Sequence, residues 1–123
     1  MTNTQSSQKN QNEIFTLSLR ERGESKSMVK QFDILPNRFE ELLEFCIAFG
    51  LLLESIEPCI TFILSTDYED DDNYGGFDNV FEIEFDFEGV SKEHSSQVIT
   101  FVTEVIEDQL IPHIYMRMER VLH

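Results

Sequence analysis

The chain has 123 residues, of which 41% are hydrophobic and 11% aromatic, a length and composition that predict one folded domain rather than a disordered chain. It carries 24 Asp and Glu against nine Lys and Arg, a formal net charge of −15. This charge excludes a protein that holds nucleic acid mainly through phosphate contacts, and it disfavours direct binding to anionic lipid.

The start of the chain, its longest apolar run and its cysteines indicate the compartment. Residues 1–12 are polar and lack the apolar core of a secretory signal, so we expect a flexible polar tail there and a single domain over residues 13–123. The longest near-apolar run, residues 45–53, falls short of the roughly 20 residues that cross a bilayer. Cys46 and Cys59 have no redox or metal-binding spacing, and we expect both to be reduced and buried. These features predict a cytoplasmic protein.

Two strands are predicted at the start of the domain. Residues 13–20 alternate apolar and polar side chains, which is typical of a half-buried strand. Turn-forming residues at 22–25 lead to a second strand over residues 27–35, whose apolar side is interrupted by Lys30. Pro36 then ends the pair.

A long helix is predicted next. Asn37 and Glu40 have the spacing of a capping box, and the helix should run to about Ser55. Its first half is amphipathic, but its second half is apolar nearly all round, which predicts enclosure by the same domain or by another subunit. The candidate residues for a dimer interface are Phe45, Phe49 and Leu52.

The second half of the chain repeats the order of strands and helix. A short strand is predicted over residues 59–65, and a strictly alternating strand over residues 80–88 follows a polar connection. Ser91 is the expected N-cap of a second helix, which Pro112 should end or kink near residue 110, before a short helix over residues 114–122. The order β-β-α-β-β-α with a short C-terminal helix predicts an α+β fold, with a mostly antiparallel four-stranded sheet and helices on one face.

The acidic residues are concentrated in the middle of the chain. Residues 39–91 hold 15 carboxylates and no Lys or Arg, so we expect these carboxylates to lack counterions within the chain. Four of them alternate along the strand at residues 80–88, about 6.6 Å apart, and another group fills the polar connection. We therefore predict a surface that faces a cationic partner, although a solvated sheet face is the alternative. The candidate partner-binding residues are Asp67, Glu69, Asp70, Asp71, Asp72, Asp78, Glu82, Glu84, Asp86 and Glu88.

Other chemistry is not expected. Oxygen ligands follow Asp67 at the spacing of a calcium loop, but Asp72 stands where the sharp turn of that loop requires Gly. The histidines, none of which has a second ligand at metal-binding spacing, are His94, His113 and His123. There is no nucleophile motif and no phosphate-binding loop, so we expect no enzyme activity, no metal and no cofactor.

The leading hypothesis is a small acidic inhibitor that binds and neutralises a basic, nucleic-acid-acting protein. Either an immunity or antitoxin protein against a nuclease toxin, or a phage-type DNA-mimic anti-defence protein, fits this description, because complementary charge speeds association and sets specificity. The alternative is a dimeric acidic secretion chaperone or assembly factor, whose apolar grooves would bind with little dependence on salt. A domain whose acidity only keeps it dissolved is the third interpretation.

Overall fold

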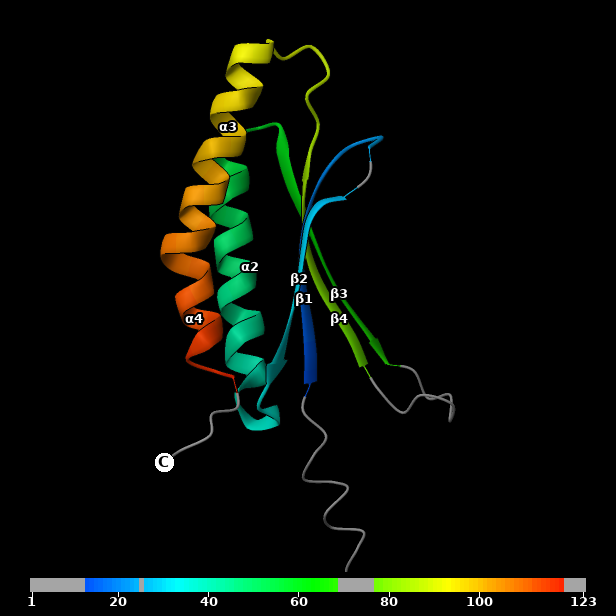
Figure 1. Ribbon diagram of the computed structural model, residues 1–123, viewed down its shortest axis with the longest axis vertical. Helices are drawn as coiled ribbons and strands as arrows, with labels where there is room; N and C mark the ends of the chain where they lie inside the picture. Colours follow the sequence, from blue (N-terminus) through cyan, green and yellow to red (C-terminus); the bar gives the residue numbers. More distant parts are fainter. Residues whose placement is uncertain (1–12, 25, 69–76, 119–123) are drawn as a thin grey trace, which may run out of the picture.

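A computed structural model describes residues 13–24, 26–68 and 77–118, which form a sheet with helices on one of its faces (Figure 1). The predicted tail, residues 1–12, lies outside the described residues. The strands are β1 (Glu13–Glu21), β2 (Lys26–Ile34), β3 (Ile60–Tyr68) and β4 (Phe77–Phe85). The helical segments are the 3-10 helix η1 (Pro36–Arg38), α2 (Phe39–Ile56), α3 (Lys92–Val105), the π-helical η2 (Ile106–Leu110) and α4 (Ile111–Tyr115). The predicted α+β class is confirmed.

The four strands lie in the order β2-β1-β4-β3. The outer pairs, β1 with β2 and β3 with β4, are antiparallel, whereas the central pair of β1 and β4 is parallel. The predicted sheet, mostly antiparallel with four strands, is therefore confirmed, and the parallel centre is the feature that strand patterns alone did not predict. It places Arg20 beside Glu84 although the two are 64 positions apart in the chain.

The core lies between the sheet and the helices. The apolar alternation of β1 and β4 supplies its floor, and both central strands place their apolar side chains against the helices at exposures of 3% or less. Burial of each such side chain stabilises the fold by about 1.5–3 kcal/mol. The largest fully buried side chains are Phe15, Leu17, Ile34, Ile60, Phe81 and Ile83 from the sheet, with Leu42, Leu53, Val98, Ile106, Leu110 and Ile114 from the helices. The opposite face of β1 and β4 carries mostly polar side chains, with Ile14 and Val80 as its apolar members.

Helix α2 lies close against the edge strand β3 because Gly50 has no side chain. A Cβ atom at Gly50 would come within 2.5 Å of the Phe62 ring, so any larger residue would have to displace that ring. One turn later, the Glu54 carboxylate accepts a hydrogen bond of 3.1 Å from the backbone N–H of Phe62. These two contacts fix α2 along the β3 side of the molecule.

The helix ends agree with the sequence in part. The Asn37 cap is wrong, because Pro36 starts a 3-10 turn that contains Asn37, and the N-cap of α2 is Arg38 without a side-chain bond. The Ser91 cap is confirmed, since its hydroxyl accepts from the His94 N–H at 3.0 Å. Near Pro112 the helix passes through the π turn η2 and continues as α4, a change that accommodates a residue without an N–H.

Candidate partner-binding surface

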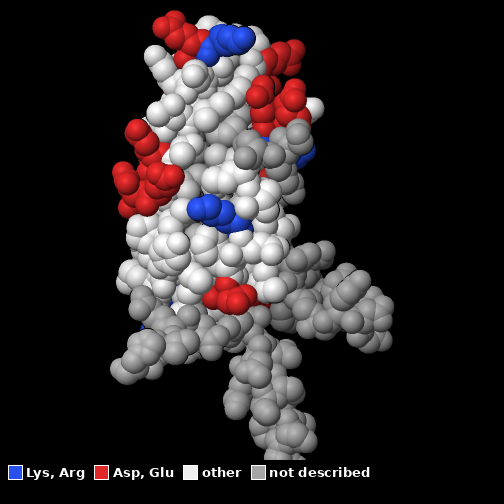
Figure 2. Space-filling view, viewed as in Figure 1, with Lys and Arg blue, Asp and Glu red and all other residues white. Residues whose placement is uncertain are grey.

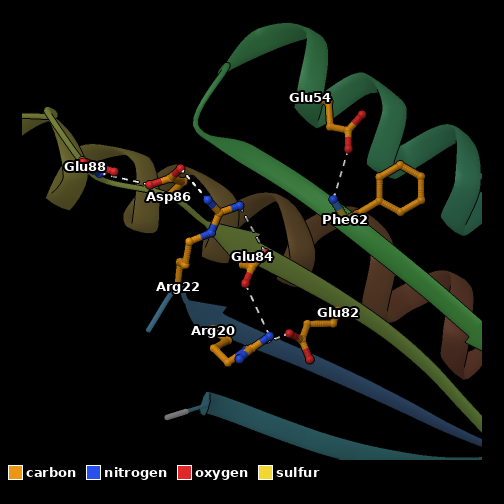
Figure 3. Close-up of polar contacts among 8 residues, drawn as sticks. All are labelled: Arg20, Arg22, Glu54, Phe62, Glu82, Glu84, Asp86 and Glu88. Atoms are coloured by element: carbon orange, nitrogen blue, oxygen red, sulfur yellow. Dashed lines mark hydrogen bonds and ion pairs between the residues drawn. The ribbon is translucent and has the colours of Figure 1, made fainter. Parts of the chain in front are cut away.

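The predicted acidic row lies beside two arginines, Arg20 of β1 and Arg22 in the turn that directly follows β1 (Figure 3). Arg20 Nε is 2.8 Å from Glu82 Oε2, and Arg20 Nη2 is 3.3 Å from Glu84 Oε2. Arg22 Nη1 is 2.9 Å from Asp86 Oδ2, and its Nη2 is 3.8 Å from Glu84 Oε1. The expectation that these carboxylates lack counterions within the chain is therefore wrong. We call these five residues the ion-pair ladder.

Exposure rises along the ion-pair ladder. The Glu82 side chain is only 8% exposed and also accepts a hydrogen bond of 3.2 Å from the fully buried Ser18 hydroxyl. The Glu84 side chain is 13% exposed and that of Asp86 36%. Glu82 and Glu84 are thus engaged within the fold, and Asp86 is the carboxylate of the ladder that solvent reaches most.

Strand β4 begins and ends three residues earlier than predicted, so the end of the acidic row leaves the sheet. Asp86 and Glu88 lie in the segment that leads to α3, where the Glu88 N–H donates to Asp86 Oδ1 at 3.2 Å. Glu88 is exposed. These two carboxylates are the part of the predicted row that remains available to a partner.

An open pocket of about 400 Å³ lies next to Asp86 and Glu88, where α2 ends, β3 begins and α3 starts. The residues that line this acidic pocket are Glu57, Pro58, Cys59, Asp86, Glu88, Val90 and His94. Glu57 Oε1 lies 3.2 Å from His94 Nε2 across the pocket. Glu57, the C-cap of α2, was not among the predicted residues, because only the packing of α2, β3 and the segment before α3 brings it to Asp86 and Glu88.

The two cysteines differ in environment. Cys46 is fully buried, and burial raises the pKa of its thiol to about 12. Cys59 is half-buried, and its thiol pKa is raised first by burial and then by the charges of Glu57 and Asp86. Cys59 is consequently the thiol that reports on the acidic pocket, while Cys46 is inert because the reactive thiolate is suppressed.

The remaining predicted acidic residues lie elsewhere. Asp67 and Asp78 are partners in the β3–β4 register, at the end of the hairpin opposite the acidic pocket. The eight positions from Asp78 to Asp86 correspond to roughly 26 Å along a strand. The other predicted members, which lie outside the described residues, are Glu69, Asp70, Asp71 and Asp72. In the view of Figure 2, the acidic side chains form separate groups, with uncharged surface and basic side chains between them.

The three candidate dimer residues are not on one surface. Phe49 is 4% exposed and packs edge-on against Phe81 in the core. Phe45 is half-buried and stacks on His113 with ring centroids 3.8 Å apart. Leu52 is 55% exposed. The exposed apolar residues of α2 are Ile47, Leu51, Leu52 and Ile56, which we call the α2 stripe.

Comparisons with protein-family models, curated proteins and solved structures find no match for this chain. Within residues 13–24, 26–68 and 77–118, no helix has the length and apolar character to cross a membrane. Among the same residues, no group of three His, Cys, Asp or Glu side chains is placed to hold a metal ion. The most distinctive feature of the described part is the acidic pocket with the ion-pair ladder beside it.

Proposed function

We propose that this chain is a small acidic inhibitor that binds a basic, nucleic-acid-acting protein, and that the acidic pocket receives Lys or Arg side chains of that partner. The observation that carries the proposal is the composition of the pocket: Glu57, Asp86 and Glu88 line it, and among the described residues no Lys or Arg does. Of these three carboxylates, Asp86 alone has an arginine partner within the described residues. The pocket is therefore a concave anionic surface on a chain of net charge −15.

The ion-pair ladder supports this role by holding the site in place. Arg22 is bound to both Glu84 and Asp86, and its backbone N–H donates to the Phe85 carbonyl at 2.8 Å. A carboxylate fixed in this way loses little conformational freedom on binding, which favours affinity.

Inhibition would follow from occupancy of the partner's nucleic-acid groove, with no chemistry in this chain. Complementary charge accelerates such an association and selects against partners of the wrong sign. The biological setting would be an immunity or antitoxin protein for a nuclease toxin, or a phage-type DNA mimic.

The proposal is tested with a double variant of the pocket, Glu57→Gln with Glu88→Gln. The immobilised protein should retain basic proteins from its native host, and added duplex DNA or RNA should release them by competing for the same groove. We expect the pocket variant to bind the retained partner at least tenfold more weakly, because two of the three pocket charges are gone. Titration calorimetry with the purified partner measures this change.

The matched control is Glu107→Gln with Asp108→Asn, which removes the same charge from exposed positions in η2. It should weaken binding less than about threefold, as expected for screened charges far from the contact. Equal losses in both variants, or a partner that nucleic acid does not displace, would contradict the proposal.

A dimeric secretion chaperone or assembly factor is the second candidate, and the α2 stripe is the observation that favours it. Leu51 and Leu52 are each 55% exposed, and Ile47 and Ile56 are 42% and 48% exposed. Ile47 and Leu51 lie on one side of the exposed face of α2, and Leu52 and Ile56 lie on its other side. Large exposed apolar side chains of this kind mark interaction sites. Binding through this surface would be insensitive to salt, unlike binding through the acidic pocket.

A further inference from the structure

The edge strand β3 directs unpaired backbone groups away from the sheet. The Cys59 carbonyl accepts from the Asp86 N–H at 2.8 Å, so the odd-numbered residues of this segment face β4 and the even-numbered residues face outward. Two outward N–H groups have acceptors within the chain: that of Ile60 donates to the Glu57 carbonyl, and that of Phe62 donates to Glu54. The next two outward N–H groups belong to Leu64 and Thr66. Neither has an acceptor among the described residues.

The opposite edge of the sheet is protected, whereas β3 is protected only at its start, where Glu57 and Glu54 accept the N–H groups of Ile60 and Phe62. Edge strand β2 carries Lys30 and Asp33, its pairing with β1 shifts register near Arg20, and its end is bridged to Met118. Charges, irregular pairing and coverage of this kind prevent an edge from pairing with another chain. From residue 60 to residue 66, β3 has no charged residue, no proline and no glycine. The difference leaves the edge at Leu64 and Thr66 free to pair with another strand.

The charge around the β3 edge selects the occupant. Glu54 and Glu57 lie directly beside the edge, and residues 39–91 contain no Lys or Arg. A second copy of this chain would bring two such surfaces together and repel, whereas a basic strand would be attracted. Ile47 and Leu51 of the α2 stripe precede Glu54 by seven and three residues and so lie on the same face of the helix. They are 42% and 55% exposed, so they can cover apolar side chains of that strand.

We infer that β3 takes up an extended segment of alternating basic and apolar residues by strand addition, with main-chain hydrogen bonds to Leu64 and Thr66. This inference rests on the proposed function, since the segment would belong to the basic partner. Main-chain hydrogen bonds supply affinity in this mode, and alternate side chains supply specificity. Strand addition would give the partner two contacts with this chain, one in the acidic pocket and one along the adjoining β3 edge.

Two synthetic peptides of equal charge test the inference: an eight-residue peptide alternating Lys and Val, and one alternating Lys and Pro. Proline cannot form the ladder of a new strand. We expect the Lys–Val peptide to slow hydrogen exchange at the Leu64 and Thr66 amides at least tenfold, measured by NMR, and the Lys–Pro peptide to leave both rates unchanged. A Glu–Val peptide should not bind.

The variant Thr66→Pro removes one outward N–H without touching the bonds to β4, and Thr66→Ala is its matched control. We expect the proline variant to bind the Lys–Val peptide at least tenfold more weakly and the alanine variant to bind it normally. If Thr66→Pro does not fold, the exchange rates in the unaltered chain still decide the question.

The outcomes separate this inference from the proposed function. Equal binding of the Lys–Val and Lys–Pro peptides, with no protection at β3, would overturn strand addition and leave the acidic pocket in place. Failure of both peptides to bind would overturn the two together. Protection of Leu64 and Thr66 that rises with protein concentration in the absence of peptide would assign the edge to a second copy of this chain and overturn the inference.

Discussion

Replacing Arg20 by methionine should lower the free energy of unfolding by about 2–4 kcal/mol, whereas the same change at Arg22 should lower it by less than about 1 kcal/mol. The reason lies in their partners. Arg20 holds Glu82, whose side chain is only 8% exposed, and Arg22 holds Asp86, whose side chain is 36% exposed. Loss of Arg20 leaves a carboxylate poorly solvated and without its arginine, but loss of Arg22 leaves one that water can reach. Urea unfolding followed by circular dichroism measures both values.

A second change identifies the cause of the Arg20 effect. If an uncompensated charge is responsible, Glu82→Gln in the Arg20→Met background should recover part of the lost stability, and the pair should be strongly non-additive. Equal destabilisation by the two arginine variants, or simple additivity with Glu82→Gln, would mean that the ion-pair ladder does not stabilise the fold in this way.

The largest effect on binding is expected from salt. Between about 0.05 M and 0.5 M salt, affinity for the basic partner should fall by roughly ten- to a hundredfold, because complementary charges that remain partly exposed are screened over a few ångströms at the higher concentration. Titration calorimetry at several salt concentrations measures the slope.

The same salt series distinguishes the two candidate functions. Apolar contacts through the α2 stripe strengthen slightly when salt is excluded from the surface, so a chaperone-like complex would hold its affinity or gain. An affinity that does not change with salt concentration would therefore contradict binding through the acidic pocket and favour binding through the α2 stripe.

Local patterns predicted the elements of the fold well. Alternation along residues 80–88 correctly separated Phe81, Ile83 and Phe85 from the carboxylates between them, and the burial of the three aromatic and aliphatic side chains confirms that separation. The Ser91 cap was equally local, since the bond spans three residues. Such features depend on the backbone geometry of one segment, which a single sequence contains.

The counterions could not be predicted in the same way. Arg20 and Glu82 are 62 positions apart, and they meet because β1 and β4 pair in parallel at the centre of the sheet. Periodicity indicates which face of a strand a residue occupies, but it does not indicate which strand lies beside it. The acidic pocket was missed for the same reason: Glu57 reaches Asp86 and Glu88 only through the packing of α2, β3 and the segment before α3.

The most direct test of the acidic pocket as the binding site is the alkylation of Cys59 by iodoacetamide, with and without the purified partner. Cys46 serves as the internal reference, because it is buried and its pKa is raised to about 12. We expect the partner to slow the alkylation of Cys59 at least tenfold at low salt. At high salt the partner should dissociate, and the alkylation rate of Cys59 should return to its value without partner. A saturating partner that leaves the rate at Cys59 unchanged would show that the acidic pocket is not where it binds.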